Sequence, residues 1–181
     1  MAGIRGGTLF DPLSVGVMPR ALSSACWRGY HCVYRVTDAA LELGELTLGL
    51  SDDDLALARR AALPGFEGLT PEDDRWSGVV YRGLARRVPF TGGALLADGF
   101  IQELYVHMGY HPAWKYREVH ELLFEDGRLL HAHDRSSVIA ELRARLAHDP
   151  LQPGVTSSRD DIARWVESTF SLDYGSLLPR S

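Results

Sequence analysis

The chain has 181 residues, of which 45% are hydrophobic and 24% are charged, and its formal net charge is −5. This length is enough to bury the core of one domain, and the composition is that of a globular protein, which argues against extensive disorder. The negative charge argues against general nucleic-acid binding, because contact with phosphates requires clustered cations. No segment approaches the roughly 20 apolar residues of a membrane span, so we expect a cytoplasmic protein.

The N-terminal twenty residues are rich in Gly and Pro. We therefore expect residues 1–20 to form a loosely structured lead-in with room for one short strand, and residues 21–181 to form a single domain. In the segment CWRGYHCVYRV, alternation predicts a strand with one apolar face, formed by Tyr30, Cys32, Tyr34 and Val36. The leucines of the next segment change parity at Gly44, which predicts a bulge there.

Helical patterns follow the first strands and dominate the end of the chain. Ser51 and Asp54 stand at capping-box positions, which predicts a short helix that ends before Pro64. Apolar residues at helical spacing predict two further helices, over 136–148 and 158–170. The fold class is therefore α+β: a mainly antiparallel sheet of hairpins, one short helix and two C-terminal helices.

Two Asp-Gly pairs predict β-hairpins, because both residues readily adopt the positive φ angles of a two-residue turn. One pair is Asp98-Gly99 in the segment FTGGALLADGFIQELYVHM, and the other is Asp126-Gly127 in HELLFEDGRLLHAHD. The second pair lies between two long alternating runs and predicts the clearest hairpin of the chain.

The second hairpin carries three histidines. A two-residue turn at Asp126-Gly127 places His120 opposite His133, and His131 lies two residues from His133 on the same face. Three imidazoles on one face can hold Zn²⁺ and leave a fourth position for water. The alternatives are a packed or solvated histidine cluster without metal, because apolar residues share that face.

Two aromatic stretches are candidate functional segments. In YVHMGYHPAW, His107 is a candidate general acid or base, but no nucleophile motif accompanies it. Arginine among aromatic residues is typical of interface hot spots. The candidate partner-binding residues are Trp27, Arg28, Tyr30, Tyr110 and Trp114. The alternative for WRGY is a core strand with one arginine at its rim, and the alternative for YVHMGYHPAW is a bent strand whose aromatic residues anchor the core or a partner surface.

The segments WRGY, FTGG and YVHMGY resemble a family of small uncharacterised bacterial proteins with these three segments in this order. The resemblance covers about residues 24–130 and implies a compact, β-rich bacterial protein. It also associates the chain with toxin, immunity and antiphage defence genes. The histidine-rich hairpin departs from the family pattern, being longer and richer in His, so the resemblance does not extend to a metal site.

The sequence therefore leads to two functional expectations. The first is a non-enzymatic protein-interaction module of a bacterial conflict or defence locus, either a toxin-neutralising immunity protein or an assembly subunit. Three observations support this expectation: the absence of a recognisable catalytic motif, the negative net charge and the aromatic stretches with arginine. The alternative is a metal-dependent hydrolytic enzyme that holds zinc on His120, His131 and His133.

Overall fold

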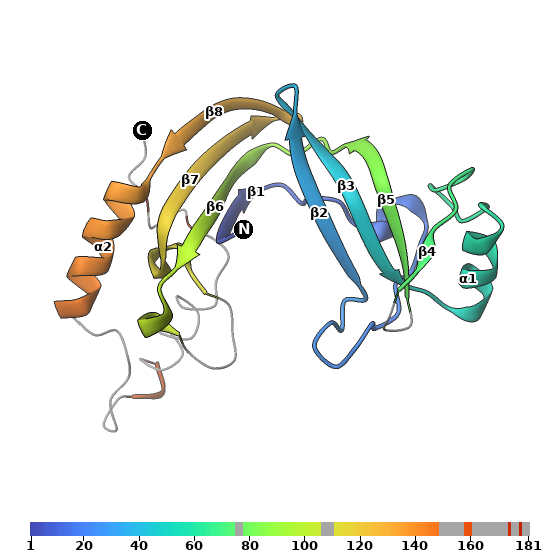
Figure 1. Cartoon of the computed structure of the whole chain (residues 1–181), viewed down its shortest axis with the longest axis horizontal. Helices are drawn as coiled ribbons and strands as arrows, with labels where there is room; N and C mark the ends of the chain where they lie inside the picture. Colours follow the sequence, from blue (N-terminus) through green and yellow to red (C-terminus); the bar gives the residue numbers. More distant parts are fainter. Residues whose placement is uncertain (75–77, 106–110, 149–157, 161–173, 175–177, 179–181) are drawn as a thin grey trace. The chain divides into compact units, whose positions relative to one another are not determined.

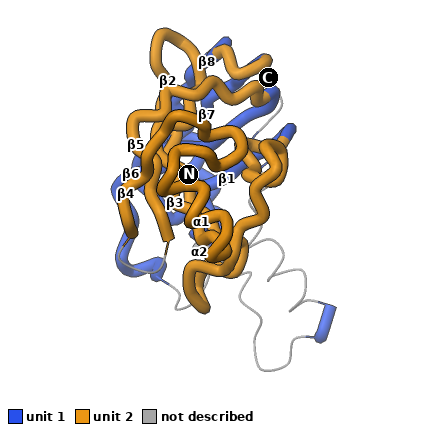
Figure 2. Tube along the Cα trace, turned by 90° about the vertical axis from the view of Figure 1, so that its right-hand side faces the viewer, with its two compact units in different colours: residues 1–7, 91–125, 129–181 blue, residues 8–90, 126–128 orange. Residues whose placement is uncertain are grey.

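The structure is a computed structural model of the chain, and it describes all residues except 75–77, 106–110, 149–157, 161–173, 175–177 and 179–181. Its contacts divide the chain into two compact units, which Figure 2 colours separately. Unit 1 consists of Met1–Gly7, Thr91–Glu125 and Leu129–Ser181, and unit 2 consists of Thr8–Phe90 and Asp126–Arg128. That residues 21–181 form a single domain stays a prediction.

The fold is α+β, and every strand pair with a defined register is antiparallel. The described residues contain eight strands, all labelled in Figure 1 together with the helices α1 and α2. The predicted class, a mainly antiparallel sheet with helices added to it, is thereby confirmed. None of the described helices is long and apolar enough to cross a membrane.

The sheet of unit 1 has the strand order β1-β6-β7-β8. Its strands are β1 (Gly3–Gly6), β6 (Gly92–Phe100), β7 (Tyr116–Glu125) and β8 (Arg128–Asp134), the first residue of which belongs to unit 2. The 3₁₀ turns η2 (Gln102–Leu104) and η3 (Ala113–Lys115) connect β6 to β7. Strand β1 falls within the predicted lead-in, where the sequence left room for one short strand.

The two Asp-Gly pairs behave differently. At the β7–β8 turn, Asp126 and Gly127 have φ angles of 47° and 73°, so both residues adopt the conformation that the predicted hairpin requires. The hairpin predicted at Asp98-Gly99 is wrong: β6 continues from Asp98 to Phe100 and stays paired with β7. Here only Gly99 has a positive φ, and Asp98 remains extended, so the chain does not reverse.

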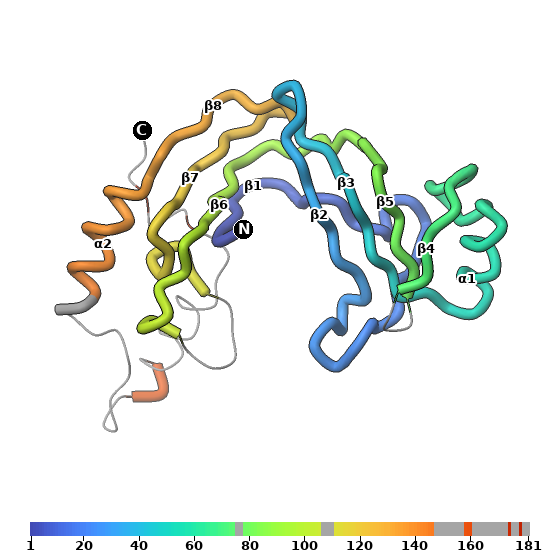
Figure 3. Tube along the Cα trace, in the orientation of Figure 1, coloured from blue at the N-terminus to red at the C-terminus, as the bar shows by residue number. Residues whose placement is uncertain are grey.

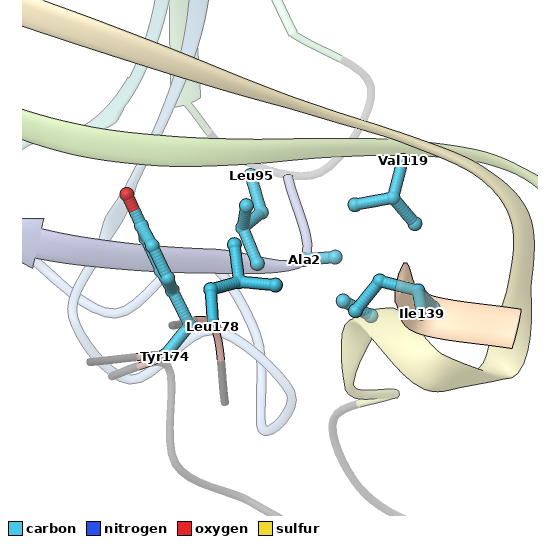
Figure 4. Packing of buried hydrophobic residues seen from close by; sticks show 7 residues of the cluster. Ala2, Leu95, Val119, Ile139, Tyr174 and Leu178 are labelled. Atoms are coloured by element: carbon cyan, nitrogen blue, oxygen red, sulfur yellow. The ribbon is translucent and has the colours of Figure 1, made fainter. Parts of the chain in front are cut away.

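The core of unit 1 lies between the sheet, the helix α2 (Ser136–His148) and the end of the chain. Figure 4 shows the side chains that converge there, from the residue before β1, from β6, β7 and α2, and from the C-terminal segment: Ala2, Leu95, Val119, Ile139, Tyr174 and Leu178. Asp134 accepts a hydrogen bond from the backbone N–H of Ser136 at 2.9 Å, which satisfies one of the N–H groups at the start of α2 that have no partner within the helix. Helix α2 confirms the first predicted C-terminal helix, whereas most of the second, over 158–170, lies outside the described residues.

The sheet of unit 2 has the order β2-β3-β5-β4. Its strands are β2 (Tyr30–Thr37), β3 (Ala40–Gly49), β4 (Glu72–Asp73) and β5 (Gly78–Arg87). A 3₁₀ turn, η1 (Pro12–Val15), precedes them, and the helix α1 (Asp52–Arg59) follows β3. The colours of Figure 3 trace this path along the chain. Ser51 accepts a hydrogen bond from Asp54 N, which confirms the predicted start of the short helix.

The predicted apolar face of β2 packs on the leucines of β3. Strand β2 places Tyr30, Cys32, Tyr34 and Val36 opposite Leu48, Leu46, Leu43 and Leu41. All four leucines are buried. The register of this pair shifts between Val33 and Tyr34, opposite Gly44, which confirms the predicted bulge.

Candidate interaction surface

Trp27 is the most exposed large hydrophobic side chain among the described residues, at 79%. It lies in the loop that leads into β2, and backbone hydrogen bonds close this loop on both sides of it. Cys26 O accepts hydrogen bonds from Leu22 N and Gly29 N, both at 3.2 Å. Trp27 is therefore held on an ordered backbone while its indole remains in solvent.

Gly29 fixes the end of this loop. Its φ is 77°, and a Cβ atom there would lie 2.2 Å from the carbonyl oxygen of Arg20. Its carbonyl also accepts a hydrogen bond of 2.8 Å from Gly49 N at the end of β3. Only glycine fits such a position. Gly29 therefore allows the backbone conformation that positions Trp27 and Arg28.

Arg28 folds back onto Tyr30. Its Nε atom donates a hydrogen bond of 2.8 Å to the Tyr30 carbonyl, and its guanidinium carbon lies 4.9 Å from the centre of the Tyr30 ring. The pKa of Tyr30 is raised by its burial and, to a smaller degree, by the negative charge of Asp11. Tyr30 therefore stays a neutral phenol at neutral pH and serves as a platform for the cation.

Exposed apolar side chains continue along β2. Val33 is 48% exposed and Val36 is 41% exposed, from the two faces of the strand. We call Trp27, Arg28, Val33 and Val36 the β2 edge surface. Tryptophan and arginine are enriched among interface hot spots, and the exposed valines add apolar area that a partner can cover.

The other predicted partner-binding residues lie elsewhere. Trp114 belongs to unit 1, where it is half-buried against the core and its carbonyl accepts a hydrogen bond of 2.7 Å from Arg143 Nε. Tyr110 and the catalytic candidate His107 lie outside the described residues. A role of Trp114 in partner binding stays a prediction, but its position is that of a packed aromatic residue.

The predicted histidine face is brought together in part. His131 and His133 lie side by side, with ring centres 5.6 Å apart and ring planes at 19°. His120 and His131 are exposed and His133 is half-buried, so this face of the hairpin is open to solvent. Within the described residues, no three His, Cys, Asp or Glu side chains are close enough to hold one metal ion. Two imidazoles alone provide an incomplete zinc site.

The sequence reasoning missed a basic pair in unit 1, a buried lysine beside a half-buried histidine. Lys115, the only lysine of the chain, is 1% exposed, and its Nζ lies 3.5 Å from His111 Nδ1 and 5.3 Å from the centre of the Trp114 ring. Burial lowers the pKa of Lys115. Burial also lowers the pKa of His111, with a smaller contribution from the charge of Lys115. Sequence alone offers no signal for this pair beyond the rarity of lysine.

A second buried cluster orders the core of unit 1. Glu121, which is buried, accepts hydrogen bonds from Arg135 Nη2 at 2.7 Å and Arg135 Nε at 2.9 Å. The guanidinium carbon of Arg5 lies 5.6 Å from the centre of the Tyr174 ring. Burial, followed by the negative charge of Glu121, raises the pKa of Tyr174 to about 12. Both bonds from Arg135 go to Oε2 of Glu121, so the ion pair is held through one oxygen of the carboxylate.

Comparisons with known proteins do not assign a role to any of these features. The chain matches no family model, no curated protein and no solved structure.

Proposed function

We propose that the protein is a non-enzymatic interaction module that binds a protein partner through the β2 edge surface. The exposure of Trp27 on a hydrogen-bonded loop carries this proposal. An indole exposed to water has a higher free energy than a buried one. A loop that is already ordered loses little conformational entropy when it binds. A partner that covers Trp27 therefore gains the free energy of burial without first ordering the loop.

We further propose that this function belongs to a bacterial conflict or defence locus, the setting that the family resemblance suggests. The protein would act in the cytoplasm, either as an immunity protein that neutralises a toxin or as an assembly subunit. Both roles require a protein partner bound at a fixed ratio. Neither requires a catalytic residue.

Affinity capture from the native cells tests the proposal. The wild-type protein should retain a partner at a stoichiometric ratio, and Trp27→Ala or Arg28→Ala should weaken that complex by at least ~1 kcal/mol if each is an anchor. Leu69→Ala is the matched control, because Leu69 is an exposed apolar residue of the same unit outside the β2 edge surface. Equal retention by Trp27→Ala, Arg28→Ala and Leu69→Ala would show that the partner binds elsewhere.

A second candidate function is a metal-dependent hydrolase that uses the hairpin histidines. The parallel stacking of His131 and His133 on an open face favours it, because both rings can turn a nitrogen towards one ion. A zinc enzyme would also need His120 as third ligand, and bound zinc would then lower the pKa of a water molecule.

Metal analysis separates the two candidates. Protein purified without chelators should retain close to one zinc ion per chain if the site exists, and His131→Ala or His133→Ala should remove it. His31→Ala is a suitable control, because His31 is also an exposed strand histidine but belongs to β2. Ligating histidines must be neutral, so zinc affinity should fall below about pH 6. Protein without zinc, even after dialysis against the ion, would leave the interaction module as the function.

A further inference from the structure

Strand β2 has one edge to which no described strand is bonded, since it pairs with β3 alone. The hydrogen bonds of β3 show which groups point to that edge. Leu41, directly opposite Val36, donates its N–H to Gly127 O, and its carbonyl accepts a hydrogen bond from Val88 N. Both groups thus bond away from β2.

Opposite residues of an antiparallel pair bond either to each other or both outwards. Because Leu41 bonds outwards, Val36 directs its own N–H and C=O to the free edge of β2. Tyr34, two residues earlier and on the same side of the bulge, does the same. The edge therefore presents backbone donors and acceptors together with the exposed side chains of Val33 and Val36.

The charge of this edge differs from that of the chain. Residues 27–37 contain Arg28, His31 and Arg35 but no Asp or Glu, whereas the whole chain has a net charge of −5. Among the described residues, neither Arg28 nor Arg35 forms an ion pair with a carboxylate. Arg35 crosses over Gly44 of β3, where a Cβ atom would lie 2.9 Å from its Nε.

We propose that the free edge of β2 binds an extended, acidic segment of the partner protein, which adds to the sheet of unit 2 as one more strand. The inference rests on the proposed function and deepens it by naming the partner's chemistry. Main-chain hydrogen bonds to Tyr34 and Val36 provide the pairing, and apolar side chains on one face of the segment cover Val36. Carboxylates on the other face of the segment pair with Arg35 once its guanidinium turns from Gly44 of β3 towards the edge, and a carboxylate near the start of β2 pairs with Arg28.

The same charges argue against a second copy of this chain as the occupant. Two β2 strands joined edge to edge would bring the basic residues 27–37 of both copies together. Like charges on adjacent strands are unfavourable. An acidic strand meets no such repulsion, so the edge selects for opposite charge.

A peptide titration tests the inference without the partner. The probes are a synthetic peptide that alternates Val with Glu and a counterpart that alternates Val with Lys. The acidic peptide should bind at least tenfold more tightly, and its binding should slow amide hydrogen exchange at Tyr34 and Val36. Exchange that stays unchanged at these two amides under saturating acidic peptide would overturn the proposal, as would equal affinity for both peptides.

Variants separate the backbone contribution from the charge contribution. Val36→Pro removes an N–H that points away from β3, and Val36→Thr, its control, keeps that N–H. Val36→Pro should weaken the acidic peptide at least tenfold relative to Val36→Thr. The double variant Arg28→Gln/Arg35→Gln leaves the backbone intact and should lose the preference for Glu over Lys, so the test survives if Val36→Pro does not fold.

Partner capture and peptide titration together distinguish the proposed interaction function from strand addition at the β2 edge. A captured partner that binds Val36→Pro and Val36→Thr equally would leave the interaction function standing and overturn strand addition. Tight binding of the acidic peptide without any captured partner would support strand addition at the β2 edge and would count against the proposed function as a partner-binding module. A homodimer in sedimentation experiments that Val36→Pro dissociates would assign the edge to a second copy and also overturn the inference.

Discussion

Ala39 adopts a backbone conformation that disfavours residues with a Cβ atom. It forms the β2–β3 turn together with Asp38, and their φ angles are 60° and 48°. Asparagine, aspartate and glycine are the usual residues of such turns, because the left-handed region costs an ordinary residue about 1–2 kcal/mol. The alternation of apolar residues predicts the strands on both sides of this turn. The turn itself contains no glycine that would indicate its left-handed conformation.

Replacing this residue should stabilise unit 2. Ala39→Gly relieves the left-handed backbone, and since glycine also gains entropy in the unfolded chain, the net gain should be about 0.5–1 kcal/mol. Urea unfolding followed by circular dichroism measures it. Ala132→Gly, at an exposed position in β8 with an ordinary backbone, is the control and should lose stability. A loss in both variants would contradict the strain at Ala39.

The buried amine of Lys115 makes stability depend on pH. Its pKa in the folded protein is lowered by burial, so the unfolded chain binds the proton more tightly. Between the folded and the unfolded pKa values the unfolded state carries more protons, and the free energy of unfolding rises with pH in that window. His111, whose pKa is also lowered, acts in the same direction at lower pH.

Removing the amine should remove this dependence. Lys115→Met keeps the length of the side chain and should raise the free energy of unfolding by about 1 kcal/mol at neutral pH, because no ammonium is then buried. The gain should shrink as the pH rises towards the ordinary lysine value. Denaturant unfolding across a pH series measures this change, and Lys115→Arg, which keeps the charge, should be less stable than wild type. A gain that is independent of pH would contradict the explanation.

At the scale of elements, alternation and capping predict more than turn chemistry does. The apolar face of β2, the bulge at Gly44 and the helix that begins after Ser51 all follow from local patterns. Asp98-Gly99 misleads because an Asp-Gly pair permits a turn without requiring one. Here pairing of β6 with β7 on both sides of Gly99 outweighs the turn preference, and a Cβ at Gly99 would lie 3.2 Å from Arg117 Cβ.

The connection between β7 and α2 depends on a buried ion pair that no sequence pattern indicates. Glu121 and Arg135 are fourteen residues apart and become partners only when β8 places Arg135 beside β7. Glu121→Leu should lower the free energy of unfolding by about 3 kcal/mol, because it leaves the guanidinium buried without a counter-charge. Glu121→Leu/Arg135→Met should recover most of that loss, and thermal unfolding measures both.

An exposed pair provides the control for this double-mutant test. Arg59 Nη2 lies 3.1 Å from Asp73 Oδ1, and both side chains are largely exposed. Asp73→Asn should change the free energy of unfolding by less than about 1 kcal/mol. If Glu121→Leu is no more harmful than Asp73→Asn, the buried pair contributes nothing beyond a surface pair.

At the scale of the molecule, the pairing of distant segments decides which unit each residue joins. Most of unit 2 is inserted between β1 and β6, where the chain leaves and re-enters unit 1 at adjacent residues: Gly6 is opposite Gly92, and Gly7 N donates to Thr91 O at 3.0 Å. The sequence predicts one short strand in the lead-in, but not its partner, since alternation within a strand carries no information about the strand beside it. The sequence also does not predict the exposure of Trp27, because that exposure depends on which other segments cover the loop.

Unit 2 also takes in three residues from far along the chain. Asp126–Arg128, the turn of the histidine hairpin, belong to it through Gly127, whose N–H donates to Phe90 O at 2.8 Å and whose carbonyl accepts from Leu41 N at 2.7 Å. These bonds require close backbone approach. A Cβ at Gly127 would lie 2.2 Å from Val88 O, at a φ of 73°. Backbone conformation and close approach therefore both demand glycine.

Gly68 separates these two demands, because its φ is 80° but no atom lies within 4 Å of the Cβ that a substitution would add. Gly68→Ala should therefore lower the free energy of unfolding by only about 1 kcal/mol, the effect of the left-handed backbone. Gly127→Ala should lose about 2 kcal/mol more, because the added methyl group must displace the Val88 carbonyl and weaken the bonds to Phe90 and Leu41. Urea unfolding gives both values, and amide exchange at Leu41 should accelerate in Gly127→Ala alone. Equal losses with unchanged exchange at Leu41 would show that this turn does not hold the distant segments of unit 2 together.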